Sequence, residues 1–270
     1  EDRPMLSPST RRSYQCIRNS AFPGCMDKDI RSINWPRAVA SESQRVAKKT
    51  LKNELGFVAA AYKEQKIPFD PVDLGVVPKA DTPWLDYAQI LTFVDAIRDT
   101  PVELPALLAL HSLRRSEIFA LRPEDIDLKA ETISVSGATV YTSSAEWIRR
   151  EENKSARSQR VVPIVIPRLF EILQDHNGDI CALGDGVRRQ INRICAANDL
   201  PEVGLHGLRR SFASLAYHLG WTEQRTMEIG GWDDVNIVHD YYIQESQKER
   251  DIHSMEMERF YEGIYNVDAE

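Results

Sequence analysis

Residues 206–220 carry the side chains best suited to bind an anion. Apolar residues at helical spacing predict a helix here, with His206, Arg209 and Arg210 on the arc opposite the apolar stripe. A histidine and an arginine three residues apart at a helix start suit a phosphate. The guanidinium can donate two parallel hydrogen bonds, and the helix terminus adds positive potential. Taken alone, the same pattern also fits a solvated polar helix face.

Two further basic segments precede this helix. Residues 113–121 place Arg114 and Glu117 three apart on one face of a predicted helix, so the carboxylate could orient a neighbouring cation or form a surface ion pair. Residues 153–164 resemble a basic hairpin that leads into a strand. Lys154 in that hairpin could donate a proton or hold a phosphate, and an ordinary cationic loop would look the same.

Residues 230–244 offer a hydrogen-bond donor and two candidate nucleophiles. Trp232 has one indole N–H. Tyr241 and Tyr242 each carry a phenol, and a free phenol has a pKa of about 10. A tyrosine nucleophile therefore needs a group that accepts its proton or stabilises the phenolate. Packing is the commoner role of a tyrosine.

The elements that must position these side chains fall into two parts. Residues 7–66 predict helices only: one that begins at Ser7-Pro8, a short one after residues 33–36, and a long one over 43–66. Four prolines between 68 and 83 interrupt any helical period and predict a linker. The second part adds two strands, at 131–141 with Gly137 as a bulge or turn and at 160–166, with Lys154 in the hairpin between them. Its helices are expected at 84–99, 104–121 with a break near His111-Ser112, 167–175, 186–198, 208–219 and from 222 onward.

Charge is distributed unevenly over the 270 residues, whose formal net charge is −7. Residues 1–75 contain 13 Lys and Arg against 9 Asp and Glu, while the remainder contains 21 against 32. A local basic surface can therefore bind nucleic acid despite the acidic mean. The candidate DNA contacts in the basic part are Arg11, Arg12, Arg45, Lys48, Lys49 and Lys52.

Composition excludes several classes of protein. A hydrophobic content of 42% allows a sizeable core, and no apolar run approaches the roughly 18 residues that a membrane span needs. The four cysteines show no metal-binding spacing, so we expect reduced thiols in a cytoplasmic protein. The first residues contain neither an initiator methionine nor a signal-peptide pattern, which favours a piece of a longer chain.

In this order, the four chemical segments resemble the motifs of tyrosine recombinases, specifically the integrases of phages and integrative mobile elements. The family pattern is Leu-Arg-x-Ser-Glu, then a hairpin Lys followed by x-Arg-x-Val-Pro, then His-x-Leu-Arg-x-x-Phe-Ala, and then Gly-(His/Trp) with a Tyr nine or ten residues later. The matching segments are 113–117, Lys154 with 160–163, 206–213, and 231–232. Residues 7–66 resemble the family's helical core-binding domain more weakly.

The sequence departs from the family pattern at a few positions. Trp232 stands where many relatives have His, and Gln244 replaces a His that often follows the nucleophile. His111-Ser112 replaces a commoner Thr-Gly. Tyr241 and Tyr242 lie nine and ten residues after Trp232. The resemblance favours Tyr242 as the nucleophile and keeps Tyr241 as the alternative.

The resemblance implies a mainly α fold with a small antiparallel β-sheet, divided into two domains. These are a helical DNA-binding domain over 1–66, a linker over 67–82, and a catalytic domain with a C-terminal tail over 83–270. It also implies double-stranded DNA with att-like sites as the partner, in the cytoplasm of a bacterial host. A homotetramer on paired sites is expected, because the apolar-rich tail at 255–265 would dock onto a neighbouring protomer.

The activity implied is DNA strand exchange through a 3′-phosphotyrosyl intermediate, without ATP or a metal ion. Arg114 and Arg209 would hold the non-bridging oxygens of the phosphate, and Lys154 would protonate the departing 5′-oxygen. His206 would accept the tyrosine proton. Trp232 would add a hydrogen bond, and Glu117 would hold an arginine or the histidine. The alternatives are a non-catalytic DNA-binding relative and a topoisomerase of type IB.

Overall fold

The computed structural model describes residues 6–77, 82–142, 144, 146–150, 159–176, 180 and 186–266. The chain divides into two compact units, Glu1–Asp81 with Val140–Ile148, and Thr82–Thr139 with Arg149–Glu270. The mainly helical composition with small sheets confirms the predicted fold class. Among the described residues, no helix is both long enough and apolar enough to cross a membrane.

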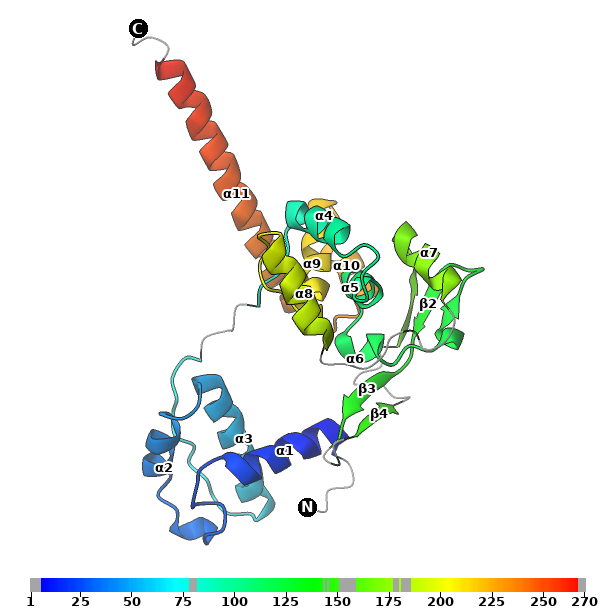
Figure 1. Ribbon diagram of the computed structural model, residues 1–270. Helices are drawn as coiled ribbons and strands as arrows, with labels where there is room; N and C mark the ends of the chain where they lie inside the picture. The colour runs from blue at the N-terminus through cyan, green and yellow to red at the C-terminus, as the bar shows by residue number, and fades with distance from the viewer. Residues whose placement is uncertain are drawn as a thin grey trace. The chain divides into compact units, whose positions relative to one another are not determined.

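The first unit contains helices α1 (Pro8–Ser20), α2 (Trp35–Glu42) and α3 (Lys48–Glu64), labelled in Figure 1. Ser7 caps α1 as expected, because its side chain accepts a hydrogen bond from the backbone N–H of Thr10. The apolar stripe predicted on α3 is buried. The helix begins at Lys48 rather than at residue 43, because a turn after α2 occupies the intervening residues.

A single aromatic cluster forms the centre of this unit. The Trp35 indole donates to the Tyr62 hydroxyl over 2.5 Å, and Phe22 and Phe69 pack edge-on against the Trp35 ring. Residues 67–77 form neither helix nor strand, yet several of their apolar side chains pack on the same core. Most of the segment expected to be a linker is therefore part of the packing of the first unit.

The second unit is built around α9 (Leu205–His218), which contacts α5 (Glu103–Leu110) and α11 (Val235–Asn266). Figure 1 shows α4 (Tyr87–Ala96), α8 (Gly186–Ala197) and α10 (Glu223–Gly230) beside α9, and α7 (Pro167–Asp175) next to β2 (Thr132–Val135). This unit also contains α6 (Arg115–Ile118). The break expected near His111-Ser112 is confirmed: Ser112 has a φ of 83°, which ends α5 and separates it from α6.

The strand expected over 131–141 is interrupted at the bulge or turn predicted at Gly137, but its two halves belong to different sheets. Strand β2 (Thr132–Val135) pairs antiparallel with β5 (Arg160–Pro163), and β1 (Ile126–Asp127) lies on the other edge of β2. Strands β3 (Ala138–Tyr141) and β4 (Trp147–Arg150) form a separate two-stranded sheet. The expected strand therefore divides between two sheets at residues 136–137. Lys154 lies outside the described residues.

Candidate active site

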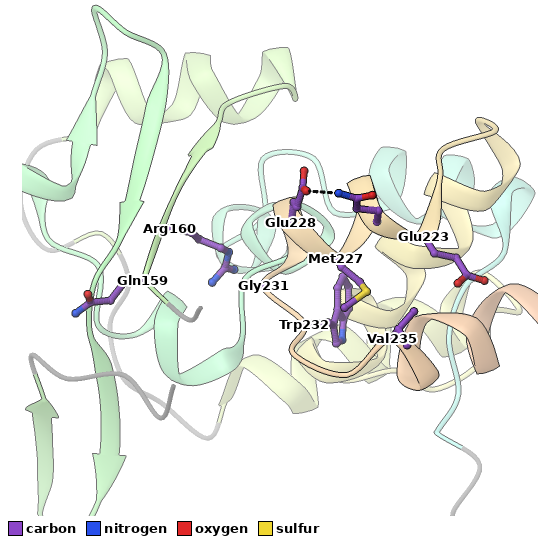
Figure 2. A pocket seen from close by; sticks show the side chains of 9 residues that line it. Gln159, Arg160, Glu223, Met227, Glu228, Gly231, Trp232 and Val235 are labelled. Atoms are coloured by element: carbon purple, nitrogen blue, oxygen red, sulfur yellow. Dashed lines mark hydrogen bonds between the residues drawn. The ribbon is translucent and has the colours of Figure 1, made fainter. Parts of the chain in front are cut away.

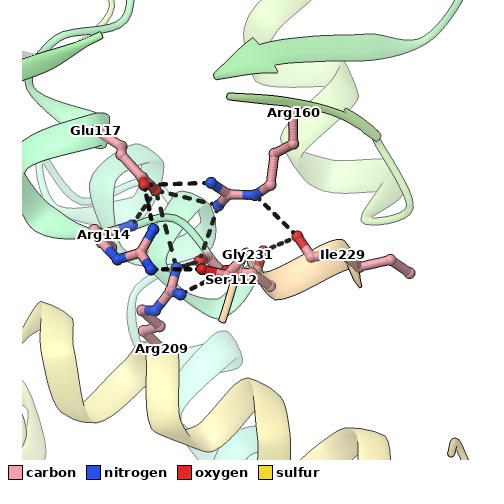
Figure 3. Close-up of polar contacts among 8 residues, drawn as sticks. Ser112, Arg114, Glu117, Arg160, Arg209, Ile229 and Gly231 are labelled. Carbon is pink, nitrogen blue, oxygen red and sulfur yellow. Dashed lines mark hydrogen bonds and ion pairs between the residues drawn. The ribbon is translucent and has the colours of Figure 1, made fainter. Parts of the chain in front are cut away.

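Three arginines from three separate elements converge on the carboxylate of Glu117, as Figure 3 shows. Arg114, immediately before α6, places Nη1 2.7 Å from Glu117 Oε1. Arg160 at the start of β5 places Nη2 3.1 Å from Oε2. Arg209 on α9 lies 3.9 Å from the same oxygen. Segments separated by up to 95 positions in the sequence thus form one cationic cluster around one buried anion.

Backbone carbonyls hold the same guanidiniums from the opposite side. Arg209 donates to the carbonyl of Ser112, and its Nη2 donates to that of Gly230 over 2.5 Å. Arg114 Nη2 donates to the Gly231 carbonyl over 2.5 Å. Gly231 ends α10 with a φ of 62°, a left-handed conformation that favours glycine. The two turns that end α5 and α10 therefore present the acceptors that fix the arginines.

Burial and neighbouring charges shift the pKa values of the cluster. Burial by itself would raise the pKa of the Glu117 carboxyl, but the charge and hydrogen bond of Arg160, the Arg114 N–H and the charge of Arg209 lower it below the ordinary value. Burial and the charge of Arg114 lower the pKa of Arg209 to about 9. Arg209 therefore remains cationic at neutral pH, although its side chain is only 2% exposed.

His206 lies in the first turn of α9, one turn before Arg209. Burial lowers the pKa of its imidazole, and the charges of Arg209, Arg114 and Arg210 lower it further. The ring is therefore within electrostatic range of two arginines of the cluster, Arg209 and Arg114. At neutral pH the lowered pKa favours the neutral imidazole, which can accept a proton.

Trp232 forms one wall of the site. Its ring lies 4.3 Å from Cζ of Arg209 and stacks on Phe212 at a centroid distance of 6.1 Å. Figure 2 shows Trp232 and Arg160 among the residues that line a cavity of about 710 Å³. The tryptophan predicted from the sequence thus lies against the arginine predicted to bind phosphate.

The two adjacent tyrosines on α11 have different surroundings. The Tyr242 hydroxyl lies 2.6 Å from Oγ1 of Thr226 and donates to the Trp221 carbonyl over 3.1 Å. Burial raises the pKa of Tyr242. The Tyr241 ring instead lies 4.8 Å from Cζ of Arg210, and Tyr241 is among the groups whose charge acts on Arg209. Tyr241 is therefore the tyrosine on the side of the arginine cluster.

The structure therefore brings together five of the predicted site residues, and among the described ones it leaves Tyr242 apart. Arg114, Glu117, His206, Arg209 and Trp232 share one site. The preferred nucleophile is bonded elsewhere, and Lys154 lies outside the described residues. Sequence reasoning missed Arg160 as a site residue. Its only signal was its place in the Arg-x-Val-Pro motif, which we interpreted as the start of a strand.

All six candidate DNA contacts of the first unit have exposed side chains. Two of them also have partners within that unit. Arg45 forms a 2.7 Å ion pair with the buried Glu42, and the Arg12 guanidinium lies 4.6 Å from the Tyr141 ring centroid. Lys48, Lys49 and Lys52 share the start of α3. These three lysines place three of the candidate charges within the first five residues of one helix.

Replacement of Glu117 by Gln is expected to lower the free energy of unfolding at pH 7 by about 3–5 kcal/mol, because three cations lose their common anion. Since folding lowers the pKa of Glu117, its carboxylate stabilises the fold above its ordinary pKa of about 4.5, and this stability is lost as the pH falls through the folded-state pKa. Denaturant titrations at several pH values measure both effects. In the variant, stability should fall less steeply below about pH 4.5.

The matched control for this prediction is Glu228→Gln. Glu228 is exposed, and its carboxylate accepts a hydrogen bond from the Gln224 side chain. This control should stay within about 0.5 kcal/mol of the unchanged protein. An equal loss in the two variants, or none in Glu117→Gln, would mean that Glu117 does not organise the arginines.

Comparison with known proteins shows the family of this chain. The Phage integrase family profile matches residues 83–249. A structure of the Tn1549 transposon integrase with transposon right end DNA is similar, with a TM-score of 0.68 and 15% identity over 93% of this chain and 96% of that one. The XerH site-specific recombinase, bound to its difH substrate after cleavage, gives a TM-score of 0.52 and 14% identity over 90% and 76%. A comparison with curated protein sequences gave no match. Since the profile covers more than half of the sequence and includes the whole arginine cluster, the chain belongs to the phage integrase family of tyrosine recombinases.

Proposed function

We propose that this protein cuts and rejoins DNA through a 3′-phosphotyrosyl intermediate, in the integration or excision of a phage or another mobile element. One observation carries the proposal: Arg114 and the buried Arg209 are held around Glu117 next to a tyrosine. The Tn1549 integrase and XerH structures, which have similar folds, contain DNA and lend support.

The cluster suits phosphoryl transfer because the charge on the non-bridging oxygens of a phosphodiester increases in the transition state. Arg114 and Arg209 would donate hydrogen bonds to these oxygens, and their fixed positions spare the cost of reorganisation. The tyrosine oxygen bonds to phosphorus as the 5′-oxygen leaves, and Lys154 would protonate that oxygen. A 5′-hydroxyl from the partner strand then displaces the tyrosine. The bond energy is conserved, so the steps need no ATP.

For the nucleophile we propose Tyr241, which reverses the preference drawn from the sequence. The Tyr242 hydroxyl is engaged by Thr226 and Trp221, whereas Tyr241 lies on the side of the arginines. Because adjacent residues on a helix point about 100° apart, only one of the two tyrosines can face the arginine cluster without a rearrangement of α11.

His206 would accept the proton of the tyrosine, so its ionisation should appear in the pH dependence of cleavage. Since its pKa is lowered, the rate of covalent-complex formation at subsaturating DNA should stay flat down to about pH 6.5 and fall only below it, as the imidazole gains a proton. His206→Asn should reduce the rate by about 10²-fold and remove this acidic limb.

The control for this measurement is His218→Asn, which changes an exposed histidine at the other end of the same helix. This variant should keep both the rate of covalent-complex formation and its decrease at acidic pH. A limb that persists in His206→Asn would assign the titration to another group and refute the role of His206 as the base.

For the first unit we propose that Lys48, Lys49 and Lys52 bind DNA phosphates. Replacement of all three by Ala should weaken binding and reduce the slope of log K against log salt concentration by about 2 to 3, because each phosphate contact contributes about 0.9. Filter binding at several salt concentrations measures the slope. The double variant Lys63→Ala/Lys66→Ala removes exposed lysines near the other end of α3 and should leave the slope unchanged. Equal slopes in both variants would exclude this contact.

A covalent selection tests the proposed function and identifies the target sequence in the same experiment. The protein is incubated with a library of duplexes that carry a nick within a randomised sequence, so that the cleaved strand end is lost and religation is blocked. DNA that stays attached to protein in denaturant is then sequenced.

Recovery of a common sequence would support the enzyme and supply its site. DNA binding without covalent capture would favour a non-catalytic relative, and relaxation of supercoils without recombinant products would favour a topoisomerase. The selected sequence also supplies the duplex for the remaining experiments.

A further inference from the structure

The first residues of the second unit are fixed to α9 and α11 by several specific contacts. The backbone N–H of Leu85 donates to Oγ of Ser211 on α9 over 2.8 Å. The Trp84 indole donates to Oε2 of Glu245 on α11 over 3.1 Å. Gly207 allows the Pro83 carbonyl to approach α9, since a Cβ there would lie 2.5 Å from that oxygen. Residues 82–85 thus connect the helix that carries Arg209 with the helix that carries both tyrosines.

Arg210 lies at the centre of these contacts. Its Cζ lies 3.7 Å from the Trp84 ring centroid and 4.8 Å from that of Tyr241, so the guanidinium contacts two aromatic rings. It donates to the Thr82 carbonyl over 2.6 Å and also to the Gln244 side chain. Arg210 therefore joins residues 82–84 to two side chains on α11.

The partners of Arg210 distinguish it from the arginines that would bind phosphate. Arg114 and Arg209 donate to carbonyls of the turns that end α5 and α10, whereas Arg210 donates to Thr82 and Gln244 and contacts the Tyr241 ring. Gln244 is three residues after Tyr241, so the two residues share one face of α11. A guanidinium that contacts both of them fixes the rotation of this part of the helix.

We propose that Arg210, held by Trp84, is a positioning residue that keeps Tyr241 aligned with the phosphate pocket. The inference rests on the proposed function, in which Tyr241 is the nucleophile. Alignment matters because a displacement of about 1 Å can cost about 10²-fold in rate. Lysine cannot replace the arginine here, because it lacks the planar group that stacks on rings and donates in two directions.

The test compares two nucleophiles in the same pocket. In the first reaction, Tyr241 attacks the selected nicked duplex at saturating concentration, and the rate of covalent-complex formation is measured for Arg210→Lys. In the second, Tyr241→Phe removes the phenol and hydrogen peroxide supplies a diffusible nucleophile. The hydroperoxide bonds to phosphorus and the 5′-oxygen leaves as a hydroxyl. The second reaction requires the arginine cluster and a folded protein, but it does not require an aligned tyrosine.

Arg210→Lys should slow the tyrosine reaction by about 30- to 100-fold. In the peroxide reaction, the rate of Tyr241→Phe/Arg210→Lys should differ from that of Tyr241→Phe by less than about threefold. The matched control is Arg225→Lys, because Arg225 also lies over a tryptophan, at 4.6 Å from Trp221, but on α10. It should leave both rates unchanged. An equal decrease of both reactions in Arg210→Lys, or no decrease of the tyrosine reaction, would overturn the inference. An absence of covalent complex in the unchanged protein would instead refute the proposed function.

If peroxide supports DNA cleavage neither in Tyr241→Phe nor in Tyr241→Phe/Arg210→Lys, fluorine NMR of 3-fluorotyrosine at position 241 decides the question. The expected result is a change in the Tyr241 resonance in Arg210→Lys, with the resonance of a label at Tyr242 unchanged. An unchanged Tyr241 resonance would show that Arg210 does not set the environment of this ring and would overturn the inference.

Discussion

Arg209→Ala is expected to reduce the rate of covalent-complex formation by about 10³-fold, or roughly 4 kcal/mol in transition-state stabilisation. Arg209 is buried and its donors are directed by the Ser112 and Gly230 carbonyls, so water cannot replace its charge within the pocket. DNA affinity should change by less than about tenfold, because phosphate contacts elsewhere supply most of the binding free energy. Single-turnover cleavage and equilibrium binding of the selected duplex measure the two effects.

Two further variants separate catalysis from folding in this experiment. Arg209→Lys keeps the charge but loses the planar fork, and it should recover only part of the rate. Arg188→Ala removes an exposed arginine on α8 and should leave the rate within about twofold. A folded Arg209→Ala protein that cleaves at the unchanged rate would remove Arg209 from the site.

Tyr241→Phe is expected to abolish covalent-complex formation, a decrease of more than about 10⁴-fold, because the substitution removes the proposed nucleophilic oxygen. Tyr242→Phe should cleave within about fivefold of the unchanged protein. It should lose about 1 kcal/mol of stability, since its hydroxyl bonds to Thr226 and Trp221. Rates on the nicked duplex and thermal unfolding distinguish the two variants.

The matched control for the pair is Tyr217→Phe, whose ring packs edge-on against Tyr242 at 5.2 Å. It removes a hydroxyl from the same region and should preserve the cleavage rate. If Tyr242→Phe were the inactive variant and Tyr241→Phe the active one, the preference drawn from the sequence would be restored and our assignment of the nucleophile would be wrong.

Local signals in the sequence predicted much of the helical structure. The Ser-Pro start of α1 and the proline at the start of α7 both mark the true helix ends, because capping and proline geometry depend on a few adjacent residues. The break near His111-Ser112 was also predicted and is confirmed. The division of residues 131–141 between two sheets was not, because strand pairing depends on residues far apart in sequence.

The sequence indicated five of the side chains that the structure brings together, but not how they are organised. The motif resemblance identified Arg114, Glu117, His206, Arg209 and Trp232, and the structure places them together. The polar arc of α9 was equally compatible with solvent exposure. Arg209 and Arg210 are instead buried, because distant carbonyls and side chains satisfy them.

Helical spacing alone could not choose between the adjacent tyrosines. Tyr241 and Tyr242 occupy neighbouring positions on α11, and the packing of Thr226, Trp221 and Arg210 around the helix separates their roles. Arg160 was missed for a related reason. A strand-forming Arg-Val-Val-Pro gives no sign that its first side chain reaches the Glu117 carboxylate.

The most direct test of a tyrosine acting beside the arginine cluster is the identity of the residue that carries the DNA. The protein trapped on the selected nicked duplex is digested with protease and nuclease, and the peptide that retains a nucleotide is sequenced by mass spectrometry. The proposed function predicts a phosphodiester on Tyr241. A nucleotide on Tyr242 would contradict the assignment of the nucleophile. A nucleotide on a residue other than a tyrosine, or a failure to trap any peptide on DNA that the protein binds, would contradict the proposed function.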